Sequence, residues 1–244
     1  MNFKKTALFG LFFIGSLYLV QAQTVKKAAV FPENKAMLTQ REKTMLEEVN
    51  ACRTAPKRYA LLLADYLKEL EKGTSLPKTR NISISTTIKN GVKTTRRDTT
   101  WTGGGIDKKN VDKEYQAAGR ECVAQLQKIK PLVALKHLEC LYNAAKTQGQ
   151  YCKKVNKLGH TGANGKGPEY RLPNACGAMP NGSENLGGGA ATIRIALFNL
   201  LVDARVADRG HRKNLLNPDA VYIGIYDIGM VNSMDNCFIQ TFGW

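Results

Sequence analysis

The stretch GHRKNLLNP, residues 210–218, places a polar histidine segment between a predicted helix and two predicted strands. Upstream, residues 190–206 repeat large aliphatic side chains at helical spacing, which predicts an amphipathic helix that delivers the segment. Downstream, residues 221–228 and 237–242 are strand candidates, and the polar connection 229–236 between them has the length of a hairpin loop. This end of the chain therefore predicts a sheet covered by helices.

The first half of the chain is predominantly helical by its pattern. Residues 38–70 predict two helices broken near Pro56, and residues 115–127 predict a third. After Pro131 a further helix is expected to run to about Val155, with regularly spaced leucines on one side. Helices first and strands last indicate an α+β fold in which helices pack on an antiparallel sheet.

Residues 72–110 differ from their surroundings because they are rich in Thr and Lys and poor in large aliphatic side chains. Two alternating arms flank Asn90-Gly91, a two-residue hairpin signal, and the second arm runs to Trp101. We interpret this segment as an exposed hairpin inserted into the domain. Its basic side chains are expected to form a solvated face or to dock a polyanion: Lys89, Lys93, Arg96 and Arg97.

The N-terminus has the pattern of a secretory signal. Lys4 and Lys5 precede a short apolar run, and small residues around Ala22 offer a cleavage site. We expect residues 1–22 to be a signal peptide and residues 23–244 to form one domain with the insertion at about 72–110. The sequence contains no second segment apolar and long enough to span a bilayer, so a secreted or periplasmic protein is predicted.

An even number of cysteines in an exported chain predicts disulfides. The six are Cys52, Cys122, Cys140, Cys152, Cys176 and Cys237. Cys140 cannot pair with Cys152, because the two fall on one predicted helix about 18 Å apart. The spacing has no C-x-x-C pair of the kind that builds a structural zinc cluster.

The formal net charge of +16 favours acidic partners such as cell-surface polyanions or anionic lipid. The basic residues are scattered and form no stripe interleaved with aromatic residues, so specific nucleic-acid binding is not expected.

Three side chains stand out as candidates for chemistry: His160, Glu184 and His211. The chain has three histidines, and two of them, His160 and His211, lie in polar, glycine-flanked segments. Two imidazoles and a carboxylate can converge on a divalent metal or act as an acid–base set. The alternative is that they only brace loops. His137 is expected on a helix as a surface or packed histidine.

Several segments, in order, resemble the CAP superfamily, which comprises cysteine-rich secretory proteins, antigen 5 and pathogenesis-related 1 proteins. They are residues 45–53 with an Asn-x-x-Arg, 160–162 (HTG), 184–186 (ENL), 210–216 (GHRKNLL) and 238–243 (FIQTFG). The resemblance implies a three-layer α-β-α sandwich with a central antiparallel sheet. It also implies a cleft of two histidines and two acidic residues that holds zinc or another divalent ion in some members.

On this resemblance His160, Glu184 and His211 occupy three of the cleft positions and are the expected metal ligands. Asp203 is the nearest acidic residue to the fourth position, with Asp208 as an alternative. Asp203 is one methylene shorter than the family's glutamate, so we expect it to orient His211 rather than to ligate a metal.

Two functions and a scaffold reading remain open. A binding module would hold a divalent metal, a lipid or a surface ligand in the cleft, whereas a hydrolase would use a catalytic zinc there. The sequence has no Gly-x-Ser-x-Gly elbow to make Ser183 a nucleophile and no His-Glu-x-x-His motif. A Cys–His nucleophile would need an unpaired cysteine. The third reading is a scaffold whose polar cleft has no ligand.

Overall fold

The computed structural model describes residues 38–244 except 73–78, 90–91, 103–111, 178 and 180. The predicted signal peptide lies outside these residues. The helices are α1 (Gln40–Thr54), α2 (Pro56–Lys72), α3 (Lys113–Lys128), α4 (Glu139–Lys154), α5 (Pro168–Cys176), α6 (Ile193–Val202) and α7 (Gly210–Leu215). The strands are β1 (Thr79–Lys89), β2 (Val92–Thr102), β3 (Lys136–His137), β4 (Gly182–Gly188), β5 (Tyr222–Val231) and β6 (Met234–Gly243).

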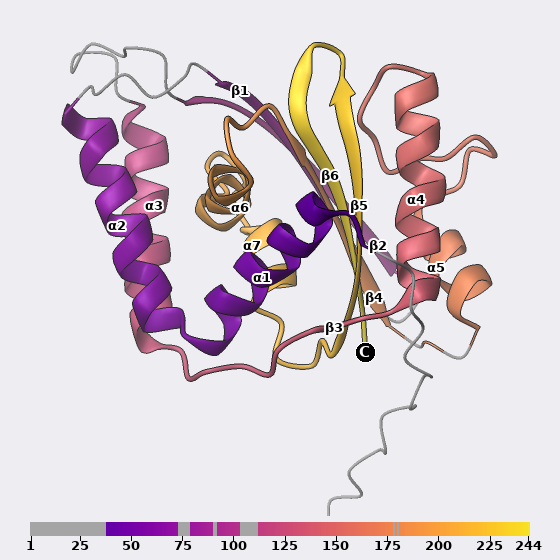
Figure 1. Ribbon diagram of the computed structural model, residues 1–244, viewed down its shortest axis with the longest axis horizontal. Helices are drawn as coiled ribbons and strands as arrows, with labels where there is room; N and C mark the ends of the chain where they lie inside the picture. The colour runs from indigo at the N-terminus through magenta and orange to yellow at the C-terminus, as the bar shows by residue number, and fades with distance from the viewer. Residues whose placement is uncertain (1–37, 73–78, 90–91, 103–111, 178, 180) are drawn as a thin grey trace, which may run out of the picture.

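Helices cover both faces of one sheet, so the predicted α+β class is confirmed. Helices α4 and α5 lie on one face, and α1, α2, α3, α6 and α7 lie on the other (Figure 1). The strand order is β2-β1-β4-β6-β5-β3. All neighbours are antiparallel except the two-residue β3, which runs parallel to β5, so the sheet is mixed rather than purely antiparallel. No helix in the described part of the chain is long and apolar enough to cross a membrane.

The Thr-rich segment forms the predicted hairpin, and this hairpin is part of the sheet. Strand β1 pairs along β4, with Thr86 opposite Glu184, and β2 forms the edge. Thr86 is buried and its hydroxyl hydrogen-bonds that of Thr95 at 2.8 Å, whereas residues 92–95 of β2 are exposed. Lys93, expected on a solvated basic face, forms an ion pair with Glu169 of α5 at 3.3 Å. The sequence does not predict the pairing of β1 with β4, because threonines take the place of the aliphatic residues typical of a strand inside a sheet.

Residues 132–138 were predicted to begin the fourth helix, but they are extended and α4 begins only at Glu139. Asn50 holds this segment through both halves of its amide, which donates to the carbonyl of Leu135 at 3.1 Å and accepts from its amide at 2.7 Å. The backbone then pairs with β5, and His137 lies in β3 instead of on a helix. These backbone bonds override the helical spacing of the leucines.

The loop-like residues 159–189 contain helix α5 and strand β4, which the sequence did not predict. The composition of β4, GSENLGG, is typical of a loop, yet it pairs on both sides, with β1 and β6. Its glycines serve packing, since a Cβ on Gly188 would lie 2.4 Å from the sulfur of Cys237. The helix predicted over 190–206 is shorter, because α6 ends at Asp203 in the left-handed conformation.

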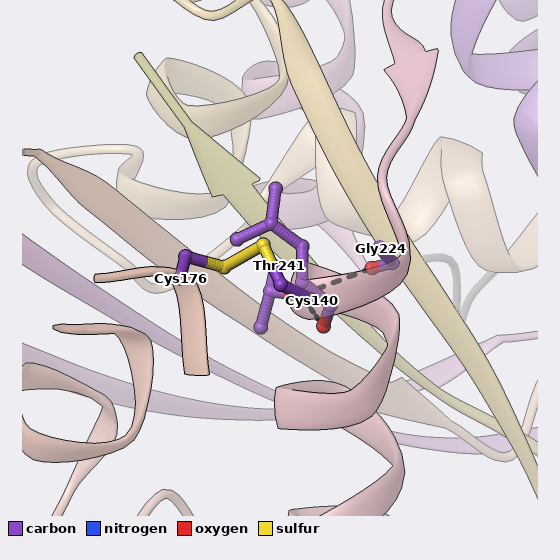
Figure 2. Close-up of a disulfide and its surroundings, with 5 residues drawn as sticks. Cys140, Cys176, Gly224 and Thr241 are labelled. Atoms are coloured by element: carbon purple, nitrogen blue, oxygen red, sulfur yellow. Dashed lines mark hydrogen bonds between the residues drawn. A yellow bond between two sulfur atoms is a disulfide. The ribbon is translucent and has the colours of Figure 1, made fainter. Parts of the chain in front are cut away.

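A single disulfide joins the cysteines in the described residues. Cys140 of α4 bonds to Cys176 of α5, beside Thr241 of β6 (Figure 2). The other four are buried and unpaired: Cys52, Cys122, Cys152 and Cys237. The exclusion of a Cys140–Cys152 pair is confirmed, and the predicted disulfides are confirmed in one pair among the described residues, while the other four thiols lie in the apolar core.

Helix α4 packs on β5 with almost no space between the two backbones. A Cβ on Gly224 would lie 2.2 Å from the backbone carbon of Leu141 and from the backbone nitrogen of Tyr142. The hydroxyl of Thr241 donates to the carbonyl of Leu141 at 2.8 Å and to that of Gly224 at 3.2 Å, as Figure 2 shows. This close approach positions the first turn of α4 on the sheet, and the helix then leads to the segment that carries His160.

We expect Gly224→Ala to destabilise the fold by about 1–3 kcal/mol, because the added methyl forces the helix backbone away from the strand. Urea denaturation of wild type and variant measures the change. Gly159→Ala is the matched control, since no heavy atom lies within 4 Å of its added Cβ, and its free energy of unfolding should change by less than about 0.5 kcal/mol. Equal denaturation midpoints for the two variants would contradict the proposed close packing.

Candidate functional site

Two buried histidine–carboxylate pairs form the candidate site. His160 Nδ1 lies 2.6 Å from Glu184 Oε1, and His211 Nδ1 lies 2.6 Å from Asp203 Oδ1. All four residues are at most 4% exposed. The four residues singled out from the sequence thus come together as two pairs, each with a carboxylate that fixes the orientation of an imidazole ring.

The charge of Glu184 is balanced by Arg171, which the sequence analysis missed. One guanidinium nitrogen of Arg171 lies 2.9 Å from each Glu184 oxygen, and another donates to the carbonyl of His160 at 2.8 Å. Burial by itself would raise the pKa of Glu184, but Arg171 and His160 outweigh burial and hold that pKa below its usual value. Glu184 is therefore an ionised carboxylate that accepts a hydrogen bond from Nδ1–H of His160. Arg171 lies in a segment with a loop-like composition, so no sequence pattern marked it.

Asp203 holds both the ring and the backbone of His211. It takes the left-handed conformation after α6 (φ 50°), and its second oxygen accepts from the backbone amide of His211 at 2.9 Å. The ring partner of His211 is thus Asp203 and not the alternative Asp208, and Asp203 orients the ring as expected. Helix α7 begins after Arg209, which is also left-handed (φ 53°).

The outer nitrogens of both rings are without hydrogen-bond partners among the described residues. His160 Nε2 and His211 Nε2 are buried, and neither has a partner. Burial lowers the pKa of His160 despite the opposing effect of Glu184, and the charge of the nearby His211 lowers it further. With Nδ1–H donated to a carboxylate, the Nε2 lone pair of each ring is available to an acid or a metal.

Two asparagines connect the His211 segment to the strand that carries Glu184. Asn185 of β4 donates to the carbonyl of His211 at 3.3 Å, and Asn214 of α7 donates to Asn185 Oδ1 at 2.7 Å. The hydroxyl of Thr87 of β1 donates to Asn214 at 3.0 Å. Both asparagines lie in the segments that resemble the CAP superfamily, but no sequence pattern predicts this contact between them.

Arg212 braces the site from behind and does not contact the imidazoles. Its guanidinium donates to the carbonyl of Leu201, to that of Val202 at 2.8 Å and to Glu121 at 2.7 Å. Arg212 therefore ties the His211 segment to α6 and α3.

The carboxylate of the predicted three-ligand set is engaged by other side chains. Among the residues described, no group of three or more His, Cys, Asp or Glu side chains is placed to hold a metal ion. Both oxygens of Glu184 are engaged by Arg171, and both oxygens of Asp203 by His211. The histidine Nε2 atoms are the donors that have no such partner.

No family model and no curated protein matches the sequence. Among solved structures, an outer surface protein from Borrelia burgdorferi is similar with a TM-score of 0.40 and 23% identity, over 57% of this chain and 95% of that one. An extracellular protein containing an SCP domain from Bacillus anthracis is similar with a TM-score of 0.37 and 19% identity, over 60% of this chain and 46% of that one. TM-scores below 0.5 describe partial likeness and do not place the chain in a family.

The Arg171–Glu184 pair should show strong coupling in a double-mutant cycle. Arg171→Met leaves an unpaired buried carboxylate, and we expect a loss of about 3–5 kcal/mol in the free energy of unfolding. Adding Glu184→Gln removes that charge, so the double variant should be more stable than Arg171→Met alone. Denaturant unfolding of the four proteins gives the coupling energy. Simple additivity of the two single losses would show that the charges do not depend on each other.

Proposed function

We propose that this chain is a secreted, CAP-like binding module that holds a divalent cation, such as zinc, through Nε2 of His160 and of His211. The observation that carries the proposal is the pair of buried Nε2 atoms without partners, each on a ring held at Nδ1 by a carboxylate. That carboxylate–histidine arrangement is typical of metal-binding histidines, because it fixes the tautomer and makes Nε2 a stronger ligand.

The donor set supports binding rather than zinc-dependent hydrolysis. Catalytic zinc sites have three protein ligands and one open position, whereas this chain offers two nitrogens. A cation held by two nitrogens keeps several positions for water or for donor atoms of a partner molecule. Glu184 and Asp203 would orient the rings, and Arg171 would keep Glu184 ionised. The ion would supply positive charge and further coordination positions.

Covalent catalysis by a neighbouring side chain has little support. Ser183 is fully buried and precedes Glu184 on a strand, so its hydroxyl and the carboxylate point to opposite faces of the sheet. The unpaired Cys152 lies nearest to the His160 segment, where its sulfur is 3.4 Å from the carbonyl of Gly159. Burial raises the pKa of Cys152, which suppresses the thiolate needed for attack.

Secretion and an acidic or lipid partner belong to the same proposal. The signal-like N-terminus and the net charge of +16 support an extracellular protein that meets cell-surface polyanions or anionic lipid. These features indicate that the partner is negatively charged. Binding screens would identify its chemical class.

Zinc titration by calorimetry at neutral pH tests the proposal. We expect one zinc ion per chain in the metal-stripped wild type and none in a His160→Ala/His211→Ala variant, because that variant lacks both Nε2 donors. His137→Ala is the matched control: it removes the third histidine, which lies in β3 beside Tyr142, and should bind as the wild type does. Circular dichroism confirms that each variant is folded.

Absence of zinc binding in the wild type would overturn the metal proposal and favour a scaffold whose polar groups only brace loops. Binding that persists in the double variant would locate the metal elsewhere.

A further inference from the structure

A second candidate site lies on the other side of Arg171, between α4, α5 and the loop after His160. It is a pocket of about 410 Å³, a size typical of small-molecule sites. Among the described residues that line it none is acidic, and Arg171 is the one with a charge. Glu184 already balances that charge. The pocket is therefore close to neutral.

Two buried polar groups in the pocket lining lack hydrogen-bond partners. Gln148 is 1% exposed and its Nε2 donates to the carbonyls of Gly159 and Thr161, which fixes the amide and leaves Oε1 without a donor. Arg171 is 9% exposed, and its terminal nitrogens are engaged by Glu184 and His160 while Nε has no acceptor. Unpaired buried polar groups of this kind are rare and costly.

These two residues approach each other beside Gly162. A Cβ on Gly162 would be 3.2 Å from Gln148 Oε1 and 3.5 Å from Nη1 of Arg171, the nitrogen that donates to the carbonyl of His160. The amide of Gln148 and the guanidinium of Arg171 therefore meet at this end of the pocket, each held by hydrogen bonds to other groups. Absence of a side chain at Gly162 leaves the space next to them open.

The remaining lining is uncharged and combines amides with tyrosine rings. Asn143 and Asn174 contribute amides, and Tyr151 and Tyr170 contribute rings. Asn174 donates to the carbonyl of Tyr170, which leaves its own oxygen available as an acceptor. Tyr170 is 42% exposed at the entrance and packs against the ammonium of Lys166, 3.9 Å from the ring centre.

We propose that this pocket binds a neutral carbohydrate. Each sugar hydroxyl both donates and accepts, so a sugar can hydrogen-bond the uncharged amides of the lining without a charged partner. The C–H faces of the sugar ring are apolar and suit the tyrosine rings, whereas the asparagine amides suit the remaining hydroxyls. An anionic ligand would find Arg171, the one charged residue of the lining, already paired with Glu184. The site is separate from the two Nε2 atoms and does not depend on metal binding.

Titrations of the ¹⁵N-labelled protein with three neutral trisaccharides test the proposal: maltotriose, galactotriose and mannotriose. They differ in hydroxyl configuration, so at least one is expected to shift the backbone amides of α4, α5 and residues 162–164. Trigalacturonate is the charged counterpart of galactotriose and should bind more weakly than the best neutral sugar. No shift with any neutral trisaccharide would overturn the proposal, and so would binding of trigalacturonate alone.

Two variants and a matched control localise the binding. Gly162→Ala fills the space beside Gln148 and Arg171, and Tyr170→Ala removes a ring at the entrance; each should weaken binding on the order of tenfold, as the loss of one contact does. Tyr142→Ala removes a tyrosine that is also on α4 but outside the pocket, and binding should not change. Wild-type affinity in folded Tyr170→Ala and Gly162→Ala proteins would overturn the assignment. Zinc titration of the same variants should remain as in the wild type.

Discussion

The fold of this protein depends on a buried carboxylate in the middle of its sheet. Glu184 lies on β4 with no exposed surface, and a charge in that position costs several kcal/mol unless it is paired and hydrogen-bonded. Arg171 and His160 supply the pairing from α5 and from the segment after α4. Three parts of the chain that are far apart in sequence must therefore dock together for any of them to be stable.

Helix α5 illustrates this dependence. It has nine residues and contains Pro173, so it would be marginal as an isolated helix. Its stability comes from its surroundings, through the Arg171–Glu184 ion pair and the Cys140–Cys176 disulfide to α4. The ion pair also connects both candidate sites, because Glu184 orients His160 while Arg171 lines the neighbouring pocket. Structural and functional roles thus share the same side chains.

The sequence predicts those parts of the fold whose conformation depends on the local pattern of residues. The helices at the two ends of the domain, the C-terminal hairpin and the arrangement of Asp203 with His211 follow from spacing and from the short reach of aspartate. Strand β4 and residues 132–138 do not, because their conformation comes from pairing partners that are distant in sequence.

The same limit applies to the candidate site. Its histidines are visible in the sequence because the residue type is rare and the flanking segments are polar. Arg171 cannot be identified in the same way, because nothing in a segment rich in Gly, Asn and Pro indicates that its arginine pairs with a buried carboxylate. The role of Glu184 changes with this partner, from expected metal ligand to a group that orients His160. Long-range electrostatic pairing, rather than periodicity, decides the chemistry.

Buried carboxylates hold the two imidazoles at Nδ1 and leave each Nε2 without a hydrogen-bond partner among the described residues. Long-range ¹H–¹⁵N correlation of the histidine rings at neutral pH tests it directly, with His137→Gln removing the third set of signals. The account predicts a proton on Nδ1 and none on Nε2 for both His160 and His211. A proton on Nε2 of either ring would contradict it.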